Sequence, residues 1–276
     1  MRQLVHLSDL HFGRDRPELL NPLIARVNAL EPDLVAISGD LTQRARHSQF
    51  EAAREFIEQL HAPVLVVPGN HDVPLENLLS RAIWPWRRYR RWITRDLNPQ
   101  FSDDEMIVLG VNTVNPSAHQ SGWFTHSAVA RVAKAFADPE DQRTRIIVAH
   151  HPLEHQPGDH KTTMRGANRA LEELARLKTD VVLSGHLHTW RAAPFAEKAG
   201  RHAILQVHAG TGLSTRQRGE ENDFNLLKIS AGTIDVIRYA VTAGSADFMI
   251  AQTLRFISRP QGWVEEQTPP MAEHSP

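Results

Sequence analysis

Five short apolar runs in this chain each end in residue types that bind metal ions. The runs occupy residues 4–7, 34–37, 64–67, 146–149 and 181–183. They are followed, in order, by Asp9 and His11, by Asp40, by Asn70 and His71, by His150 and His151, and by His186 and His188. Ligands of open α/β sheets bind outside the carboxyl ends of the strands, where side chains from neighbouring strands converge. The sequence therefore predicts a metal site assembled from strand ends.

Residue spacing and glycines favour the same site. Alternate side chains of an extended segment point to one face, so Asp9 and His11 are expected to reach one metal cluster, as are His186 and His188. Glycines precede three of the motifs, where the chain must turn sharply and expose its backbone. These glycines are Gly39, Gly69 and Gly185.

Each motif also has an ordinary structural explanation when it stands alone. An aspartate or histidine after a strand is often a turn or capping residue. The conjunction of five motifs, each behind its own apolar run, favours the metal site. His6 lies inside the first run, where we expect a packed residue rather than a ligand. Asp72 has two explanations, because a carboxylate in this place either orients a ligand histidine or caps a turn.

Composition narrows the chemistry. The 276 residues are 41 % hydrophobic, which is enough for one sizeable core. There is no cysteine, so disulfides, thiolate zinc sites and cysteine nucleophiles are excluded. A formal net charge of -1 gives no overall attraction to nucleic acid, which makes nucleic acid an unlikely partner. The chain lacks a signal-peptide pattern and a bilayer-spanning run of ~20 apolar residues, so we expect a cytoplasmic protein.

Periodicity predicts an α/β fold. Apolar residues three or four positions apart indicate helices over residues 50–60, 127–136 and 167–178, the second capped by Ser127. Alternating strands and helices predict crossover units and a largely parallel sheet. The last third has strand-like runs without long helices, which predicts an antiparallel meander in a second sheet packed on the first. These runs are residues 203–207, 224–229, 233–239 and 248–257.

The C-terminal end is richer in proline and polar residues than the rest of the chain. We therefore expect one domain over residues 1–258 and a mobile tail over residues 259–276.

Together, the five motifs resemble those of the calcineurin-like metallophosphoesterases, in particular the branch of class III cyclic nucleotide phosphodiesterases and glycerophosphodiesterases. The resemblance covers about residues 5–212 and implies a four-layer α/β/β/α sandwich of two mixed sheets. It also implies that His71 faces the substrate phosphate as a catalytic residue without binding metal. The implied ligands are Asp9, His11 and His188 for one metal, Asn70, His150 and His186 for the second, and Asp40 as the bridge between both.

One assignment depends on a single residue step. The family's ligand histidine stands immediately before a residue and a proline, so His150, rather than His151, fits the sequence His150-His151-Pro152. The implied cofactors are two divalent metal ions. Oxygen and imidazole ligands suit manganese, iron or zinc, and do not choose among them.

The chemistry of such a pair of ions agrees with this resemblance. Two ions ~3.5 to 4 Å apart share a bridging hydroxide that forms near neutral pH and attacks phosphorus in line. His71 can neutralise charge on the phosphoryl oxygens or protonate the leaving alkoxide, and its residue type suits both roles.

The sequence identifies the residues that contact the substrate less clearly than it identifies the metal ligands. Arg14, Asn112 and His208 follow predicted strands near the expected cleft, and we treat them as candidate substrate contacts. Residues 83–93 mix arginine with tryptophan and tyrosine. This segment has three interpretations: a packed amphipathic helix, an arm that binds an anionic substrate, or a peripheral membrane contact through Trp84 to Trp92.

The leading function is hydrolysis of small soluble phosphodiesters, with cyclic nucleotides as the best single substrate. The alternative is a UDP-sugar-lipid pyrophosphate hydrolase of the lipid A precursor type, or another lipid phosphoesterase. A nuclease ranks third, because the chain has no excess positive charge. A non-catalytic scaffold ranks last, because every expected ligand is present. The sequence leaves the oligomeric state open.

Overall fold

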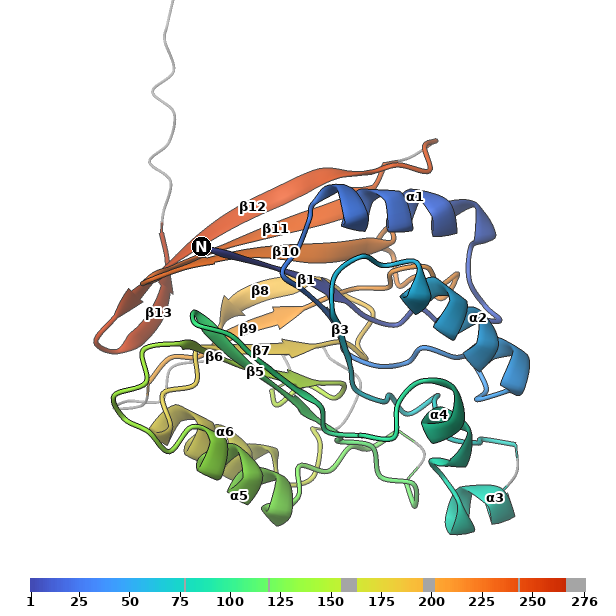
Figure 1. Ribbon diagram of the computed structural model, residues 1–276, viewed down its shortest axis with the longest axis horizontal. Helices are drawn as coiled ribbons and strands as arrows, with labels where there is room; N and C mark the ends of the chain where they lie inside the picture. The colour runs from blue at the N-terminus through green and yellow to red at the C-terminus, as the bar shows by residue number, and fades with distance from the viewer. Residues whose placement is uncertain (77, 119, 155–162, 196–201, 243, 267–276) are drawn as a thin grey trace, which may run out of the picture.

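Two β-sheets pack face to face, and helices cover their outer faces (Figure 1). The computed structural model describes residues 1–276 except 77, 119, 155–162, 196–201, 243 and 267–276. The helices are α1 (Pro17–Ala29), α2 (His47–Glu58), α3 (Leu78–Ile83), α4 (Arg87–Trp92), α5 (His126–Ala135) and α6 (Ala167–Arg176). This arrangement confirms the predicted α/β sandwich of two mixed sheets.

The first sheet has seven strands in the order β13-β12-β11-β10-β1-β2-β3. Its strands β1, β2 and β3 are parallel, and β10 pairs antiparallel with β1. The bounds are β1 (Arg2–Leu7), β2 (Leu34–Ile37), β3 (Val64–Val66), β10 (Asp223–Ser230), β11 (Thr233–Val241), β12 (Phe248–Arg259) and β13 (Gly262–Glu265).

The second sheet has six strands in the order β4-β5-β6-β7-β9-β8. Its strands β5, β6, β7 and β9 are parallel, while β4 and β8 are antiparallel edges. The bounds are β4 (Gln100–Ser102), β5 (Met106–Val111), β6 (Thr144–Ala149), β7 (Val181–Ser184), β8 (Arg191–Pro194) and β9 (Leu205–His208).

The arrangement of the parallel strands corrects one expectation. The five motif-bearing strands do not form a single parallel sheet, because β1, β2 and β3 lie in one sheet and β6 and β7 in the other. The antiparallel meander extends the first sheet, and the run at residues 203–207 contributes β9 to the second. The parallel strands of both sheets are buried on both faces, so they are all largely apolar, and the sequence does not reveal which runs are neighbours.

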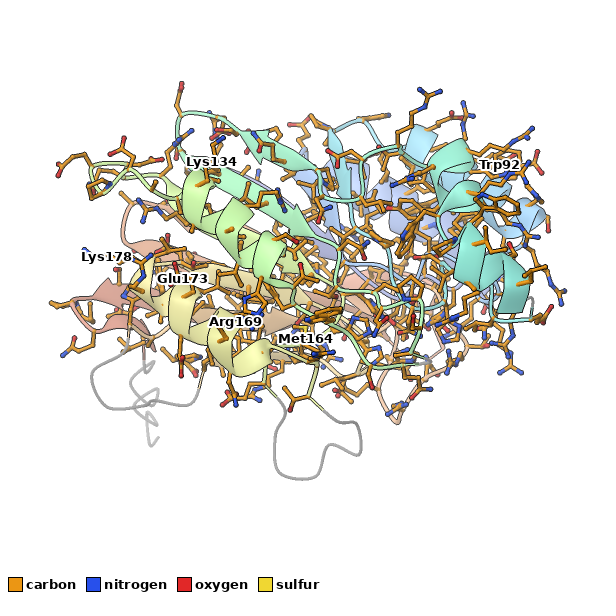
Figure 2. All side chains as sticks on the ribbon, turned by 90° about the horizontal axis from the view of Figure 1, so that it is seen from below. Trp92, Lys134, Met164, Arg169, Glu173 and Lys178 are labelled. Carbon is orange, nitrogen blue, oxygen red and sulfur yellow. The ribbon has the colours of Figure 1, made fainter. Side chains whose placement is uncertain are left out.

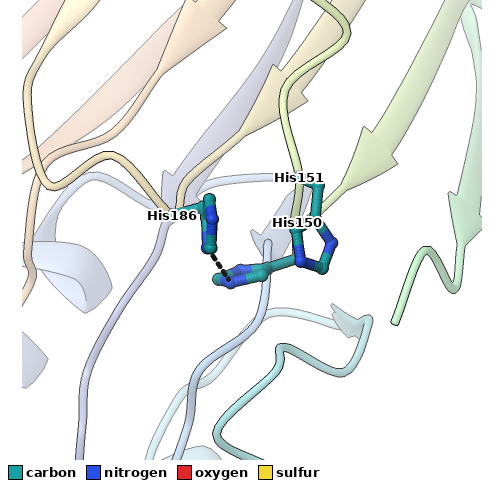
Figure 3. Close-up of side chains that lie close together, drawn as sticks. All are labelled: His150, His151 and His186. Carbon is teal, nitrogen blue, oxygen red and sulfur yellow. Dashed lines mark hydrogen bonds between the residues drawn. The ribbon is translucent and has the colours of Figure 1, made fainter. Parts of the chain in front are cut away.

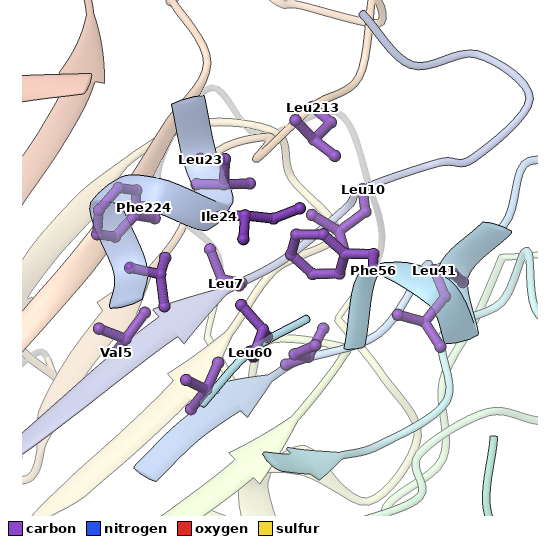
Figure 4. Close-up of a cluster of buried hydrophobic side chains, with 14 of the residues drawn as sticks. Val5, Leu7, Leu10, Leu23, Ile24, Leu41, Phe56, Leu60, Leu213 and Phe224 are labelled. Carbon is purple, nitrogen blue, oxygen red and sulfur yellow. The ribbon is translucent and has the colours of Figure 1, made fainter. Parts of the chain in front are cut away.

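Three apolar layers hold the fold together. Leu4 and Ala36 of the first sheet pack against Val148 and Leu183 of the second in the central layer. A second layer joins the first sheet to α1 and α2, as the cluster in Figure 4 shows with Leu7, Leu23 and Phe56. The third joins the second sheet to α5 and α6, which lie side by side with Lys134 and Glu173 on their surface (Figure 2).

The helix at residues 126–135 begins earlier than its sequence suggests. The capping residue is Thr125, whose Oγ1 accepts a hydrogen bond from the backbone N–H of Ala128 at 3.1 Å. The prediction that Ser127 caps this helix is wrong. Both residues are good caps in isolation, and the direction of the incoming chain decides between them.

The predicted domain boundary at residue 258 is also wrong, because β12 continues to Arg259 and β13 follows. Trp263 of β13 is buried, and its Nε1 donates a hydrogen bond to Asp180 Oδ1 at 2.9 Å. Asp180 directly precedes β7, so this end of the chain connects the first sheet to the second. The remainder of the predicted tail, residues 267–276, lies outside the described residues.

We expect Trp263→Ala to lower the free energy of unfolding by about 3–5 kcal/mol, because it removes a buried indole and the donor to Asp180. Ile250→Ala in β12 is the matched control, since the Ile250 side chain is exposed, and should change stability by no more than about 0.5 kcal/mol. Urea denaturation measures both. Equal effects of the two substitutions would show that β13 does not stabilise the domain.

Candidate metal centre

The ends of strands from both sheets bring acidic and imidazole side chains into two buried clusters. In the first, one ligand atom from each of four residues lies within 4.8 Å of the others. Asp9 Oδ1 is 3.5 Å from His11 Nε2 and 3.1 Å from His188 Nε2. The two imidazole nitrogens are 3.3 Å apart. The fourth residue, Asp40, has Oδ2 3.7 Å from His11 Nε2.

The second cluster lies on the other side of the same carboxylate. His150 Nε2 is 3.2 Å from His186 Nδ1, the pair joined in Figure 3, and 3.1 Å from Asn70 Oδ1. The same nitrogen is 3.5 Å from Asp40 Oδ2. A single oxygen of Asp40 therefore faces a histidine of each cluster.

Two adjacent histidines are close enough to join the second cluster. His150, His151 and His186 all place a ring nitrogen within 4.8 Å of one another. His150 donates from Nδ1 to Ser38 O at 2.8 Å, which directs its Nε2 at Asn70 and Asp40. His151 instead has Nδ1 2.8 Å from Thr113 Oγ1. The contacts with Asn70 and Asp40 favour His150.

Backbone carbonyls fix the orientation of a further imidazole. His188 donates from Nδ1 to Arg216 O at 2.9 Å, so its Nε2 faces the cluster. Such hydrogen bonds set which ring nitrogen is left to bind a metal.

The donor set of the first cluster suits a cation. Asp9 Oδ2 accepts hydrogen bonds from Ser8 Oγ at 2.6 Å and from the His186 N–H at 2.9 Å. Its other oxygen, Oδ1, is fully buried and has no hydrogen-bond donor among the described residues. A buried carboxylate oxygen that faces two imidazole nitrogens instead of donors is a geometry that fits a metal ligand.

The electrostatics agree with that fit. Burial raises the pKa of Asp9 and Asp40, but the neighbouring histidines together outweigh burial and hold both pKa values well below the usual range. His188 contributes the largest part of this effect at Asp9, and His150 contributes the largest part at Asp40. Burial lowers the pKa of His150, but Asp40, Asp9 and the hydrogen bond to Ser38 O together outweigh burial and raise it to about 9. The two carboxylates are therefore held as anions, as cation binding requires, whereas a cation that binds at His150 would displace the proton from that imidazole.

The backbone at the clusters differs from the predicted extended conformation. Five of the candidate ligands have left-handed φ angles, so each pair with a spacing of two lies in a tight turn rather than along a strand. Such conformations cost non-glycine residues about 1–3 kcal/mol each and are concentrated at functional sites. These residues are Asp9 (φ 52°), His11 (φ 51°), Asp40 (φ 52°), His186 (φ 71°) and His188 (φ 60°).

Glycines let these turns approach one another. Gly39 has a φ of +97° immediately before Asp40, as its predicted turn requires. Gly69 has a different role, because a Cβ there would lie 2.2 Å from both N and Oδ1 of Asp40. Only a residue without a side chain lets the segment after β3 pass this close to the Asp40 carboxylate.

Asp72 joins the segments that follow β2 and β3. Its carboxylate accepts hydrogen bonds from the backbone N–H groups of Leu41, Thr42 and Gly69 at 2.9–3.2 Å. None of its hydrogen bonds within the described part of the chain goes to a histidine, which corrects one of the two explanations considered for it. Burial and the nearby Asp40 charge raise its pKa to about 7.

His71 lies between the clusters and an open cavity of about 460 Å³. Its backbone N–H donates to Asp40 Oδ1 at 2.8 Å, and its Nδ1 donates to Gln43 O at 2.8 Å. Its Nε2 accepts a hydrogen bond from Arg216 Nη1 at 3.0 Å. Burial lowers the pKa of His71 to about 4. The cavity is lined by Gly13, Arg14, Gln43, Arg44, Arg46, Gln49, His71, Glu76, Gln120 and Arg216.

The candidate substrate contacts separate into two groups. Arg14 lines the cavity, so it stays a candidate substrate contact. Asn112 does not line it, and its Oδ1 instead accepts a hydrogen bond from the Val114 N–H at 3.0 Å, which closes a local turn. His208 does not line it either, because it is buried at the end of β9.

The cavity also contains arginines that the sequence did not single out. Arg44 and Arg46 follow Asp40 by a few residues, and Arg216 follows the glycine-rich segment after β9. In the sequence, these arginines could have been recognised only by their closeness to a metal-binding motif or to the glycines after β9. The dense arginine segment at residues 83–93 was the more prominent pattern, and it does not line the cavity.

That segment lies beside the cavity rather than over it. Tyr89 of α4 is buried and donates to Val66 O at 3.3 Å, and Arg88 donates to Ala45 O at 2.8 Å. Ile83 and Trp84 are exposed. The packed-helix interpretation therefore holds for one face of α4, and none of its arginines lines the cavity.

Comparison with known proteins agrees with this geometry. Residues 2–190 match the calcineurin-like phosphoesterase family, so the chain belongs to that family. A purple acid phosphatase from yellow lupin (Lupinus luteus) seeds has the same fold with a TM-score of 0.66 at 16% identity, over 92% of this chain and 53% of that one.

Three curated relatives are similar in sequence. Glycerophosphodiester phosphodiesterase GpdQ of Enterobacter lignolyticus is 27% identical over 54% of this chain, which spans 57% of that relative. A probable cyclic nucleotide phosphodiesterase of Rhodopseudomonas palustris is 26% identical over 72% of this chain and 77% of its own length. UDP-2,3-diacylglucosamine pyrophosphatase LpxG of Chlamydia trachomatis is 23% identical over 67% of this chain and 63% of its own length. Among the described residues, no helix has the length and apolarity needed to cross a membrane.

The two adjacent histidines provide a test of the second cluster. We expect His150→Ala to lower bound manganese by about one equivalent per chain, because it removes an imidazole that faces both Asn70 and Asp40. His151→Ala should keep the metal content of the parent protein. Elemental analysis after dialysis measures both, and the reverse result would exchange the roles of the two residues.

Proposed function

We propose that this protein is a metal-dependent phosphodiesterase that hydrolyses small phosphodiesters at a pair of divalent ions. The observation that carries the proposal is the position of Asp40 Oδ2, 3.7 Å from His11 Nε2 and 3.5 Å from His150 Nε2. One carboxylate oxygen placed between two clusters suits a bridge between two cations. The proposed ligands are Asp9, His11 and His188 for one ion, Asn70, His150 and His186 for the other, and Asp40 for both.

Manganese, iron and zinc all suit these oxygen and nitrogen donors. When bound, two such ions supply a water nucleophile that is deprotonated near neutral pH and offset the charge that develops on a phosphoryl group. The protein contributes the turns, glycines and carbonyl hydrogen bonds that hold the ligands in place.

His71 is the proposed catalytic residue. Its Nδ1 is held by Gln43 O, which leaves Nε2 directed at Arg216 beside the cavity. Nε2 can pass a proton to the leaving oxygen of a phosphodiester only when the ring is in its imidazolium form. This role, worth about 10²- to 10⁴-fold in rate, therefore requires that the charge of the bound substrate raise the pKa of His71.

Two substrate types follow from the relatives. Cyclic nucleotides are the first candidates among small diesters, because the Rhodopseudomonas palustris relative matches 72% of this chain. A UDP-sugar-lipid pyrophosphate is the second, because the cavity has four arginines and LpxG is a relative. The exposed Ile83 and Trp84 beside the arginines of α4 support a peripheral membrane contact for such a substrate.

A substitution pair separates metal binding from proton transfer. We expect Asp40→Ala to abolish hydrolysis of bis-p-nitrophenyl phosphate and to lower bound manganese, because it removes the bridge. His71→Ala should keep the bound manganese and lower kcat by about 10²- to 10⁴-fold.

The control is His61→Ala, which changes an exposed histidine. A steady-state assay and elemental analysis on the same preparations measure each effect. Unchanged activity in Asp40→Ala would refute a binuclear mechanism.

A further inference from the structure

We infer that the cavity beside the metal centre is a subsite for a second phosphoryl group of the substrate. It would bind this group through Arg14, Arg44, Arg46 and Arg216, while the reacting phosphoryl group lies at the metal centre. The inference rests on the proposed function and names a substrate class for it: phosphodiesters that carry a further phosphate, above all esters of diphosphate.

The charge of the cavity lining is the first observation. Four arginines line it, against one carboxylate, that of Glu76. Glu76 lies 3.2 Å from Arg46 Nη2 and 3.7 Å from Arg44 Nε. Within the described part of the chain, Arg14 and Arg216 form no ion pair. A protein with a net charge of -1 thus concentrates positive charge at one place, which favours binding of a multiply charged anion.

The segment that presents Arg44 and Arg46 is held in a fixed shape. Ala45 between them has a φ of 52°, and its N–H donates to Thr42 Oγ1 at 3.0 Å. Its carbonyl accepts the hydrogen bond from Arg88, and both flanking N–H groups donate to Gln49 Oε1. The left-handed residue and its hydrogen bonds keep both arginine side chains at the cavity, although a strained backbone costs stability.

Hydrogen bonds also hold the segments that carry the other two arginines, Arg14 and Arg216. Thr215 donates from both its N–H and its Oγ1 to Arg14 O, at 2.8 and 3.0 Å. This contact holds Arg14 next to Arg216, which follows Thr215 directly. Arg14 and Arg216 are thereby held as neighbours, and both line the cavity.

Arg216 connects this subsite to the metal centre. Its Nη1 donates to His71 Nε2 at 3.0 Å, and its carbonyl accepts the hydrogen bond from His188. A phosphoryl group on the arginines is therefore a neighbour of one at the metal centre. Planar guanidinium groups bind phosphate oxygens bidentately, and a cavity of about 460 Å³ has room for a diphosphate with part of its substituent.

The charge of the cavity favours diphosphate esters over cyclic mononucleotides, which reverses the order that the relatives support. A cyclic mononucleotide carries one phosphoryl group, and when this group lies at the metal centre, Arg14 and Arg216 have no anionic partner among the described residues. A diphosphate ester fills both places, whether it is a soluble nucleotide sugar or is linked to a lipid.

The test compares two uridine compounds as competitors of bis-p-nitrophenyl phosphate in the manganese-loaded protein. UDP-glucose has a diphosphate, whereas the methyl ester of UMP has a single phosphodiester. Because hydrogen bonds between charged groups are strong, we expect UDP-glucose to compete about ten- to hundredfold more tightly. In the double variant Arg44→Gln/Arg46→Gln, this preference should fall to about threefold or less.

Arg259→Gln is the matched control, since Arg259 is exposed at the end of β12 and does not line the cavity. It should keep the preference of the parent protein, and thermal unfolding verifies that all variants are folded. A parent protein without the preference, or a double variant that retains it, would overturn the inference. Absence of any bis-p-nitrophenyl phosphate hydrolysis would instead refute the proposed function, and calorimetry would still measure the preference.

A third competitor distinguishes the two sources of a diphosphate. UDP-2,3-diacylglucosamine in detergent micelles should compete more tightly than UDP-glucose if the natural substrate is lipid-linked. Equal competition by both compounds supports a soluble substrate. Either outcome supports the subsite, provided that the double arginine variant weakens competition by both compounds.

Discussion

The carboxylate of Asp40 is the constraint on which the rest of the structure depends. One of its oxygens faces a histidine from each of two clusters, and the other accepts the N–H of His71. Strands from two different sheets must therefore end at the same place to surround it. The close approach of Gly69 and the left-handed turn at Asp40 itself both serve this requirement.

Placing charges inside a protein has a cost, and the fold offsets it around the site. Asp9 and Asp40 are buried among histidines that hold them as anions, and Asp72 accepts backbone hydrogen bonds that join the segments after β2 and β3. Three apolar layers support the left-handed turns that carry Asp9, Asp40 and the ligand histidines. A close-packed core resists the backbone movements by which such turns would relax. Rigid ligand geometry is what a binuclear centre requires of its protein.

Beside this buried centre lies an exposed cavity. It is open, and its arginines are supplied by loops rather than strands. Arg14 and Arg216 meet across about two hundred residues of sequence through Thr215, and Arg44 and Arg46 are fixed by Gln49. The division of labour is common in α/β proteins, in which strand ends position the chemistry and loops select the substrate.

The sequence by itself determined the strands, the family resemblance and the residues that gather around Asp40, because local apolar runs and the ligand types behind them are visible along the chain. Only the tertiary structure decided that these strands belong to two sheets, that β13 completes the domain and that the ligand turns are left-handed. The tertiary structure also determined that four arginines from separate loops line one cavity. Side-chain convergence depends on contacts between distant segments, such as Trp263 with Asp180 or Thr215 with Arg14, which leave no periodic signal in a sequence.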